Sequence, residues 1–460
     1  MVATEPGRHD VVTLPAIQML RHMYGDFPNF FRRTSAEHGP IVRFHGNLPL
    51  PRRQDIYFVN EPAAIEEVLA TKGTSFRKSR GARRLRQIVG KGLLTSDEPQ
   101  HLAHRRLIQP AFHRKRLEGF ARVMASASEA RVASWSEGTL VDVDHEMNRL
   151  ALDIVSQALF GVDLTGDMET ISRSLDTAMG MYHFWQTPLT ELFDDWPLPN
   201  VLAFKAARER LRGIVMRIVR QYRANSSAGD DLLSMLLAAR DENGRGGLTD
   251  DEVRDEALTI LLAGHETTAN ALAWTFYVLQ RRPDVEAALH RYVDETLGDR
   301  PVTFEDVGKL EFVRAVFAET MRLYPPAWIT SREALEPVTI GGVDVAERDL
   351  VILSPYVTHR DPRYWSDPDR YDPARFMDGA PPRERYAYFP FGGGTRMCIG
   401  DSFAWTEGVI ALATIAQRVR LERIPGDREV AARPLVTLRP RTPIRARVRV
   451  RRGAPERAAV

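Results

Sequence analysis

The sequence contains a single cysteine, Cys398, among its 460 residues. A chain with one thiol forms no intramolecular disulfide, so its fold does not depend on an oxidising compartment. No apolar run approaches the ~18 consecutive positions that a membrane-spanning helix needs, and residues 1–15 carry charges in place of the apolar stretch of a secretory leader. We therefore expect a cytoplasmic protein without a membrane span.

An excess of one charge is missing as well. Lys and Arg together number 63 and Asp and Glu 61, which gives a formal net charge of +2. Because nucleic-acid-binding proteins present a concentrated basic face, we expect no nucleic-acid partner. The most basic stretch, residues 444–451, alternates apolar residues with arginines. This alternation favours a half-buried strand with its arginines in water over a basic arm.

Internal repeats and low-complexity linkers are also absent, which predicts a single domain over residues 1–460. Strand patterns occur at residues 41–44 and Ile56–Val59, and Gly341-Gly342 indicates a hairpin turn. The remaining pattern is mostly helical, so the predicted fold class is mainly α with a small β region. The β-rich part should comprise about 35–70, 329–357 and 430–452, and the helical part about 75–325 and 400–420.

One long helix is predicted near the middle of the chain. Thr249 and Glu252 have the spacing of a capping box, and apolar periodicity continues to Leu279, before Pro283. About 30 residues at 1.5 Å per residue would cross a whole domain. The centre of this helix nevertheless contains residues that suit a buried helix poorly: Gly264, His265, Glu266, Thr267 and Thr268.

This polar centre indicates a functional site. A buried carboxylate such as Glu266 is costly unless it is paired, and two adjacent threonines can bond back to carbonyls one turn earlier. Several local rules broken at one place are typical of function. The alternative is a plain helix–helix contact at Gly264 with exposed polar neighbours.

A second helix should begin at Thr303 and end before Pro325. Glu319 lies on its apolar stripe, and Arg322 follows at the i+3 position, where it could pair with the carboxylate. The planar guanidinium can serve further acceptors at the same time. An ordinary surface pair is the alternative, because this spacing is common.

The most distinctive stretch is the glycine-rich segment before Cys398. The three glycines at 392–394 permit backbone conformations that other residues avoid. Arg396 and the start of a following helix place positive charge and amide groups near the thiol, which favours the thiolate that a borderline metal requires. A phosphate-binding loop is disfavoured because GxxxxGK[ST] is absent. An inert buried cysteine remains the simpler alternative.

Taken together, these motifs resemble those of the cytochrome P-450 superfamily over most of the chain. The haem-binding pattern F-x-x-G-x-R-x-C-x-G is met at residues 391–400, and the oxygen-activating pattern [AG]-G-x-[DE]-T-[TS] at residues 263–268. The E-x-x-R pair is Glu319 and Arg322, and the P-x-R-F element comprises Pro373, Arg375 and Phe376. All four motifs stand in the family order.

The resemblance implies haem b between the long central helix and the helix after the cysteine loop, with the Cys398 thiolate as the axial iron ligand. It implies a structural triad of Glu319, Arg322 and Arg375. His104 is a rival to His101 as a haem contact, and Arg332 could instead be a strand-edge charge. The haem-binding residues that it implies are His101, Arg105, Ala263, Gly264, Arg332, Phe391, Gly392, Arg396 and Gly400.

The resemblance further implies a monooxygenase that uses O2, with Glu266 and Thr267 delivering protons. No flavin or iron–sulfur domain is attached, so the two electrons should come from a separate ferredoxin or similar donor with its reductase. The basic residues 113–116 could receive that donor, or they could be a solvated helix end. We expect a monomer.

The expected reaction is hydroxylation or epoxidation of an apolar small molecule of the fatty acid, terpenoid or polyketide type. The alternatives are a peroxygenase or haem-dependent isomerase on the same fold, which retention of Glu266 and Thr267 disfavours, and a non-catalytic haem sensor. The loop at about 84–94 and Leu435 should contribute substrate contacts. The predicted pocket residues are Ala263, Thr267, Ala327, Trp328, Ile329 and Val436.

Overall fold

The computed structural model describes residues 11–22, 25–45, 54–162, 164–186, 194, 196–225, 231–238 and 247–451. The first ten residues, on which most of the leader prediction rests, lie outside this set. Among the described residues, no helix combines the length and the apolar character that crossing a bilayer demands.

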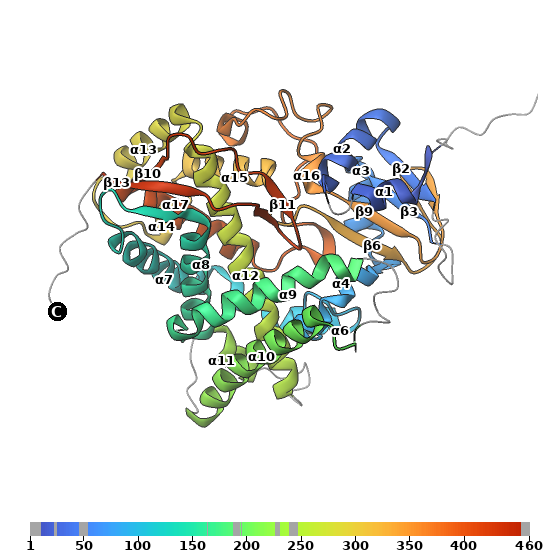
Figure 1. Cartoon of the computed structure of the whole chain (residues 1–460), viewed down its shortest axis with the longest axis horizontal. Coiled ribbons are helices and arrows are strands. Elements are labelled where there is room, and N and C mark those ends of the chain that lie inside the picture. The colour runs from blue at the N-terminus through green and yellow to red at the C-terminus, as the bar shows by residue number, and fades with distance from the viewer. Residues whose placement is uncertain are drawn as a thin grey trace, which may run out of the picture.

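Most of the described chain is helical (Figure 1). The shorter helices of the first hundred residues lie close to the larger sheet, and the longer helices form the rest of the molecule. Their bounds are α1 Ala16–His22, α2 Phe27–His38, α3 Pro62–Glu66, α4 Arg80–Arg84, α5 Arg86–Val89, α6 Gln100–Ile108, α7 Arg114–Ala133, α8 Val143–Phe160, α9 Met168–Gln186, α10 Pro199–Asn225, α11 Leu232–Ala238, α12 Asp250–Leu279, α13 Pro283–Leu297, α14 Phe304–Val307, α15 Glu311–Leu323, α16 Pro355–Thr358 and α17 Asp401–Arg418.

Six strands from distant parts of the sequence form the larger sheet. Strands β3 and β9 are parallel, with Ile56 opposite Leu350, and β4 and β6 are antiparallel, with Lys78 opposite Arg332. The predicted turn at Gly341-Gly342 is confirmed by the hairpin of β7 (Val338–Ile340) and β8 (Val343–Val345). The order in the sheet is β1 (Thr13–Pro15), β2 (Ile41–His45), β3 (Ile56–Val59), β9 (Leu350–Leu353), β6 (Thr330–Ala334) and β4 (Phe76–Lys78).

A three-stranded sheet contains the C-terminal strand that the alternating arginines predicted. Strand β13 (Arg445–Val450) lies between β10 (Val419–Arg423) and β5 (Leu140–Asp142). The side chains of Ala446 and Val448 are fully buried, as expected for a half-buried strand. Strands β4 and β5 occur in segments that were predicted to be helical. Both are only three residues long and depend on a distant partner strand, which local periodicity does not reveal.

The central helix α12 spans the predicted residues. The capping box of Thr249 and Glu252 is present, and the helix has 30 residues. The second predicted helix is wrong in one respect, because the structure divides it into α14 and α15. Leu310, between them, is fully buried and has the non-helical angles φ −84 and ψ 54. The helix is interrupted at Leu310, whose side chain is buried in the core.

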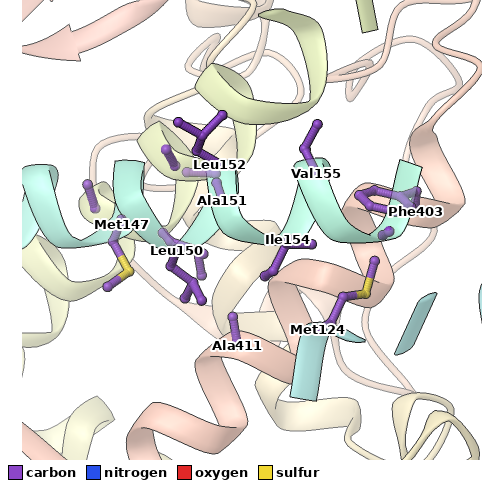
Figure 2. Packing of buried hydrophobic residues seen from close by; sticks show 14 of the residues in the cluster. Met124, Met147, Leu150, Ala151, Leu152, Ile154, Val155, Phe403 and Ala411 are labelled. Atoms are coloured by element: carbon purple, nitrogen blue, oxygen red, sulfur yellow. The ribbon is translucent and has the colours of Figure 1, made fainter. Parts of the chain in front are cut away.

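Helix α8 packs against α12 and against α7, which in turn packs against α17, and buried side chains of α7, α8 and α17 belong to one cluster (Figure 2). Its buried side chains include Met147, Leu150 and Ile154. A Cβ at Gly264 of α12 would lie 3.0 Å from Cγ2 of Val155, so the glycine allows the two helices to approach closely. This close approach is one reason for glycine at position 264, and the assignment of Gly264 to haem binding stays a prediction. The neighbouring His265, Glu266 and Thr268 are buried, unlike in the helix-contact alternative.

Candidate active site

The cysteine loop obtains its shape from close packing against residues 67–71. Gly394 has φ +64, and a Cβ there would lie 1.8 Å from the Leu69 carbonyl oxygen, so only glycine fits. The Cys398 amide donates to the Phe391 carbonyl at 2.9 Å, which closes the loop just before α17 begins. The glycine run is therefore needed to place Cys398.

The Cys398 thiol is accessible to solvent, although protein lies around it in most directions. Burial raises the pKa of Cys398 to about 11, and the hydrogen bond from the Gly400 amide and the charge of Arg105 lower it only in part. The sequence predicted a local field that favours the thiolate. The amide contribution is present, but the cation that acts on the thiol is Arg105 and not the predicted Arg396. Burial outweighs both, and coordination by a metal is what would remove the proton.

Helix α6 contributes Arg105 and the two rival histidines. Arg105 donates from Nη1 to the Met397 carbonyl at 2.7 Å, next to the cysteine. His101 pairs with Glu98 at 2.8 Å, and burial, followed by the nearby Arg396, lowers the pKa of His101 to about 4. His104 points elsewhere, because its Nδ1 lies 2.6 Å from Glu256 of α12. His101 is thus the histidine beside Arg396, as the resemblance implied.

Three cations, Lys78, Arg332 and Arg396, lie close together. Lys78 and Arg332 are directly opposite each other on antiparallel strands, where like charges repel. Burial first, and then the charges of Arg332 and Arg396, hold the pKa of Lys78 well below its ordinary value, and burial lowers the pKa of Arg332 to about 10. In the described structure, no carboxylate forms an ion pair with Lys78 or Arg332. The carboxylate that pairs with Arg396 is that of Glu98, at 3.5 Å.

This cation cluster of Lys78, Arg332 and Arg396 fits the two carboxylates of haem b, since buried cations require opposite charge. Sequence reasoning missed Lys78, because its position opposite Arg332 depends on pairing between strands far apart in the chain. No group of three or more His, Cys, Asp or Glu among the described residues could hold a metal ion. A single protein thiolate is enough for an iron that is already bound within a haem macrocycle.

The predicted triad is assembled. Arg322 donates from Nε and Nη2 to the Glu319 carboxylate at 2.7 and 2.8 Å, and Arg375 Nε lies 3.5 Å from Glu319. The Asp372 amide also donates to Glu319, at 2.8 Å. Both side chains of the Glu319–Arg322 pair are completely buried. Burial raises the pKa of Glu319 even against these partners.

In the middle of α12, three of the predicted residues interrupt an otherwise buried surface, and Gly264 is one of them, being partly exposed. Ala263 is exposed and Thr267, one turn later, is partly exposed, whereas His265, Glu266 and Thr268 are buried. The Thr267 hydroxyl donates to the Ala263 carbonyl at 2.6 Å. Ala263 and Thr267 therefore present one accessible face in the middle of α12.

Helix α17 connects this part of α12 to the cysteine loop. Glu407 of α17 is completely buried, and neither carboxyl oxygen has a hydrogen bond of normal geometry. The nearest polar group is the Thr268 hydroxyl, and burial raises the pKa of Glu407 to about 8 against its influence. The helix that follows Cys398 thus packs directly beside the polar centre of α12.

The predicted pocket residues differ in accessibility. Ala327 is exposed, and Ile329 and Val436 are partly exposed. Trp328 is buried: its ring packs edge-on against Phe27, and its indole N–H donates to the Leu435 carbonyl at 2.9 Å. Trp328 thus supports the loop between β11 (Ala432–Pro434) and β12 (Leu438–Pro440), which α12 also anchors because Trp274 donates to the Leu438 carbonyl.

The loop at residues 90–95 is fixed to the first half of α12. Asp255 accepts from the Lys91 amide at 2.8 Å, and Glu256 accepts from the Leu93 amide at 3.0 Å. A Cβ at Gly90 or Gly92 would collide with the side chains of Asp255 or Thr259. The structure therefore brings this predicted substrate loop next to α12.

Glu266 has partners that the sequence did not reveal. Its carboxylate accepts hydrogen bonds from the Thr437 hydroxyl and from Arg439 Nε, the latter at 2.8 Å. Arg439 lies on β12 and also pairs with Asp176 of α9. No spacing rule connects residues this far apart in sequence, so only the fold identifies them.

Comparison with known proteins gives consistent matches. The family model for cytochrome P-450 matches residues 11–446. Cyclooctatin synthase of Streptomyces melanosporofaciens is 38% identical over 89% of this chain and 89% of its own length. Cyclooctat-9-en-7-ol 5-monooxygenase of the same organism is 36% identical over 80% and 81%.

Pentalenene oxygenase of Streptomyces avermitilis is 32% identical over 99% of this chain and 98% of its own length. Among solved structures, the cytochrome P450DA heme domain superimposes with a TM-score of 0.84 at 28% identity, covering 96% of this chain and 98% of that one.

Proposed function

This chain belongs to the cytochrome P-450 family, and from that premise we propose that it hydroxylates or epoxidises a cyclic terpenoid with O2 and two electrons from a separate donor. The family and the fold imply haem b with an axial cysteine thiolate and a monooxygenase activity. Cys398 is the only cysteine, so it is the residue that would bind the iron.

The observation that carries the proposal is the exposed Cys398 in the same loop as Arg396, which belongs to the cation cluster of Lys78, Arg332 and Arg396. These cations would bind the two carboxylates of the haem, and Arg105 would hold the cysteine loop in shape through the Met397 carbonyl. When bound, haem b supplies the iron chemistry that activates O2. The protein must orient the substrate, limit the entry of water and supply protons.

Glu266 and Thr267 would supply the protons. Thr267 is on the accessible face of α12, and its hydroxyl now donates to the Ala263 carbonyl, from which it could turn toward a bound group. Glu266 is the neighbouring buried carboxylate. A hydroxyl on the accessible face and an acid behind it form a proton path that does not fill the pocket with water.

The substrate class follows from the relatives and from the accessible side chains. Pentalenene and cyclooctat-9-en-7-ol are, by their names, a cyclic hydrocarbon and a cyclic alcohol, and the relatives oxidise terpenoids. In this chain the apolar residues Ala263 and Ala327 are exposed and Val436 is partly exposed. Of the three classes expected from sequence, we favour terpenoids over fatty acids and polyketides.

The electron donor would dock beside the cysteine loop. Residues 113–115 are exposed, and Phe112 lies 3.7 Å from the position of a Cβ on Gly400. Leu102 and Met397 add exposed apolar surface, at 41% and 38% of their full areas. A basic and apolar patch next to the thiolate suits an acidic ferredoxin.

Titration of the haem-loaded protein with cyclic terpenes, fatty acids and macrolide-type polyketides tests the substrate class. We expect a change of iron spin state, seen in the Soret absorption, with terpenes at lower concentrations than with the other two. Turnover should require a ferredoxin and its reductase, and the product should contain one atom of 18O from labelled O2. Turnover with peroxide alone would favour the peroxygenase alternative.

The variant Cys398→Ser provides the control. It should lose the thiolate-type absorption of the reduced CO complex even where haem remains bound. A wild-type protein that lacks this absorption would contradict the assignment of Cys398. A binding preference for fatty acids would contradict only the terpenoid proposal.

A further inference from the structure

The β12 strand of the C-terminal hairpin lies against α12 (Figure 1). The Leu438 carbonyl accepts from the Trp274 indole of α12 at 2.9 Å, and the Leu438 amide donates to the Pro326 carbonyl at 3.0 Å. Asn270, also on α12, donates to the Thr437 hydroxyl at 3.2 Å. Bonds from two other segments therefore fix the β12 side of the hairpin tip.

The β11 side of the tip is held by fewer bonds. Leu435 is buried, and its carbonyl accepts from the Trp328 indole at 2.9 Å. The Leu435 amide is satisfied within the turn, by the Thr437 carbonyl at 2.9 Å. Among the residues that the structure describes, no other group outside the hairpin bonds the backbone of Leu435 or Val436. The position of Val436, at the tip, therefore depends on one indole N–H.

The Trp328 side chain is itself held firmly. It is buried, and its ring packs edge-on against Phe27 of α2, with the ring centroids 6.0 Å apart. The Trp328 carbonyl accepts from the Ser354 hydroxyl at 2.8 Å. A buried ring that is held on two sides gives its N–H a single direction, which is what a reliable support for a neighbouring loop requires.

The tip lies beside the accessible face of α12. Thr437 donates to Glu266, which precedes Thr267 in the sequence, and accepts from Asn270, about one turn after Thr267. Val436 is joined directly to Thr437 and is partly exposed. The position of the tip therefore affects which molecules can reach Thr267.

We propose that Trp328 determines specificity as a positioning residue, because its N–H fixes Val436 through the Leu435 carbonyl and so limits the orientations of a bound molecule. The inference rests on the proposed function and deepens it, since Val436 belongs there to the apolar surface for the substrate. A tip with one position favours one orientation of the substrate, and hence one oxidised carbon. Without the indole N–H, the Leu435 carbonyl loses this donor and the tip becomes free to move.

Three variants separate the mobility of the tip from its shape. Trp328→Phe removes the N–H but keeps an aromatic ring beside Phe27. Its matched control is Trp365→Phe, because the buried Trp365 also donates its indole N–H to a backbone carbonyl, that of Ala387, at 3.3 Å. Val436→Ala shortens the side chain at the tip and leaves the Trp328 bond in place.

Hydrogen–deuterium exchange of the haem-loaded proteins measures the mobility of the tip. We expect peptides that cover residues 435–438 to exchange about five- to tenfold faster in Trp328→Phe than in the wild type. In Trp365→Phe they should exchange at the wild-type rate. Unchanged exchange in Trp328→Phe would mean that its N–H does not hold the tip. Equally fast exchange in Trp365→Phe would indicate a general loss of stability and would also overturn the inference.

Binding of imidazole and 4-phenylimidazole, followed by the Soret absorption, measures the space beside the haem. Both probes bind ferric iron through nitrogen, and only the second extends a phenyl ring away from the metal. The ratio of their dissociation constants should change by about threefold or more in Trp328→Phe and in Val436→Ala, and it should stay at the wild-type value in Trp365→Phe. A constant ratio together with faster exchange would mean that the tip moves without affecting binding, which would contradict the role in specificity.

These readouts do not depend on the substrate class. If the wild type prefers fatty acids to terpenes, the terpenoid proposal fails, and exchange and azole binding still decide the role of Trp328. If a cyclic terpene is oxidised, Trp328→Phe should change the ratio of product isomers, whereas Trp365→Phe should not. An unchanged ratio would contradict the role of Trp328 and leave the proposed function intact.

Discussion

The protein contains two buried Glu–Arg pairs that differ in how the arginine is held. In the Glu319–Arg322 pair, the arginine directs all five donors to partners, namely the Glu319 carboxylate and the carbonyls of His359, Pro368 and Arg370. In the Glu266–Arg439 pair, the arginine bonds two carboxylates, one of them on the exposed side of α9. The first arginine is enclosed and the second remains connected to the surface.

This difference indicates what each pair is for. An arginine with every donor bonded, three of them to backbone carbonyls, has one arrangement, so Glu319 and Arg322 fix α15 against the segment at 359–372. An arginine shared between two carboxylates can leave one of them without losing all its partners.

Breaking the enclosed pair should have the largest effect. We expect Arg322→Met to lower the free energy of unfolding by about 3–5 kcal/mol, because it removes the closest cation of a completely buried carboxylate and leaves three backbone carbonyls without this donor. Denaturant unfolding of the haem-loaded protein measures the change. The double variant with Glu319→Leu removes the unpaired charge but not the unpaired carbonyls, so it should recover only part of the loss. Full recovery would contradict the role given to the carbonyls.

The same contrast explains what the sequence could predict. Glu319 and Arg322 are three residues apart on one helix, so spacing alone suggested their pairing, and the structure has it. Arg375 was predicted through a motif and also lies at Glu319. Helix α12 was predictable from its cap and periodicity. The Glu319–Arg322 pair and α12 are local in sequence, and local geometry determines them, whereas the contact of Arg375 with Glu319 was reached only through a motif.

What could not be predicted depends on contacts between distant segments. Lys78 meets Arg332 only because β4 pairs with β6, and Arg439 meets Glu266 only because the C-terminal hairpin lies on α12. The burial that raises the pKa of Cys398 is likewise a property of the folded chain. The motifs located the site, but the charges that act on it come from elsewhere in the fold.

Breaking the open pair should cost less stability. We expect Arg439→Leu to lower the free energy of unfolding by about 2–3 kcal/mol, since Glu266 keeps the Thr437 hydroxyl as a hydrogen-bond donor. Denaturant unfolding of the haem-loaded protein measures the change. Arg439→Lys is the matched control and should behave like the wild type. A loss as large as that of Arg322→Met would mean that the two pairs are energetically equivalent.

A third buried pair, His104–Glu256, differs from these two because its contribution to stability depends on pH. The hydrogen bond to Glu256 raises the pKa of His104 even though burial opposes this. The stabilisation is therefore complete below the ordinary histidine pKa of about 6.5 and is lost as the pH rises through the raised value. We expect a pH-dependent part of about 1–2 kcal/mol. His104→Gln should remove it.

The measurement for His104 should compare unfolding free energies of the wild type and His104→Gln above pH 6.5. Below that pH, the lowered pKa values of His101 and His265, each about 4, act in the opposite direction. The raised pKa of Glu407 contributes equally to both proteins and cancels. If the difference between the two proteins does not change with pH, the pair does not titrate as proposed.

Among the ion pairs compared, an exposed one should contribute least to the free energy of unfolding. Arg223 at the end of α10 lies 2.7 Å from Asp250 in the first turn of α12, and both side chains are 48% exposed. Water screens this pair and its side chains lose rotamer freedom, so Arg223→Ala should change the free energy of unfolding by at most about 1 kcal/mol. The change should shrink further when unfolding is repeated in high salt, whereas that of Arg322→Met should not, because buried charges are screened much less. A salt-independent loss above that limit would mean that burial does not govern the energies of these pairs.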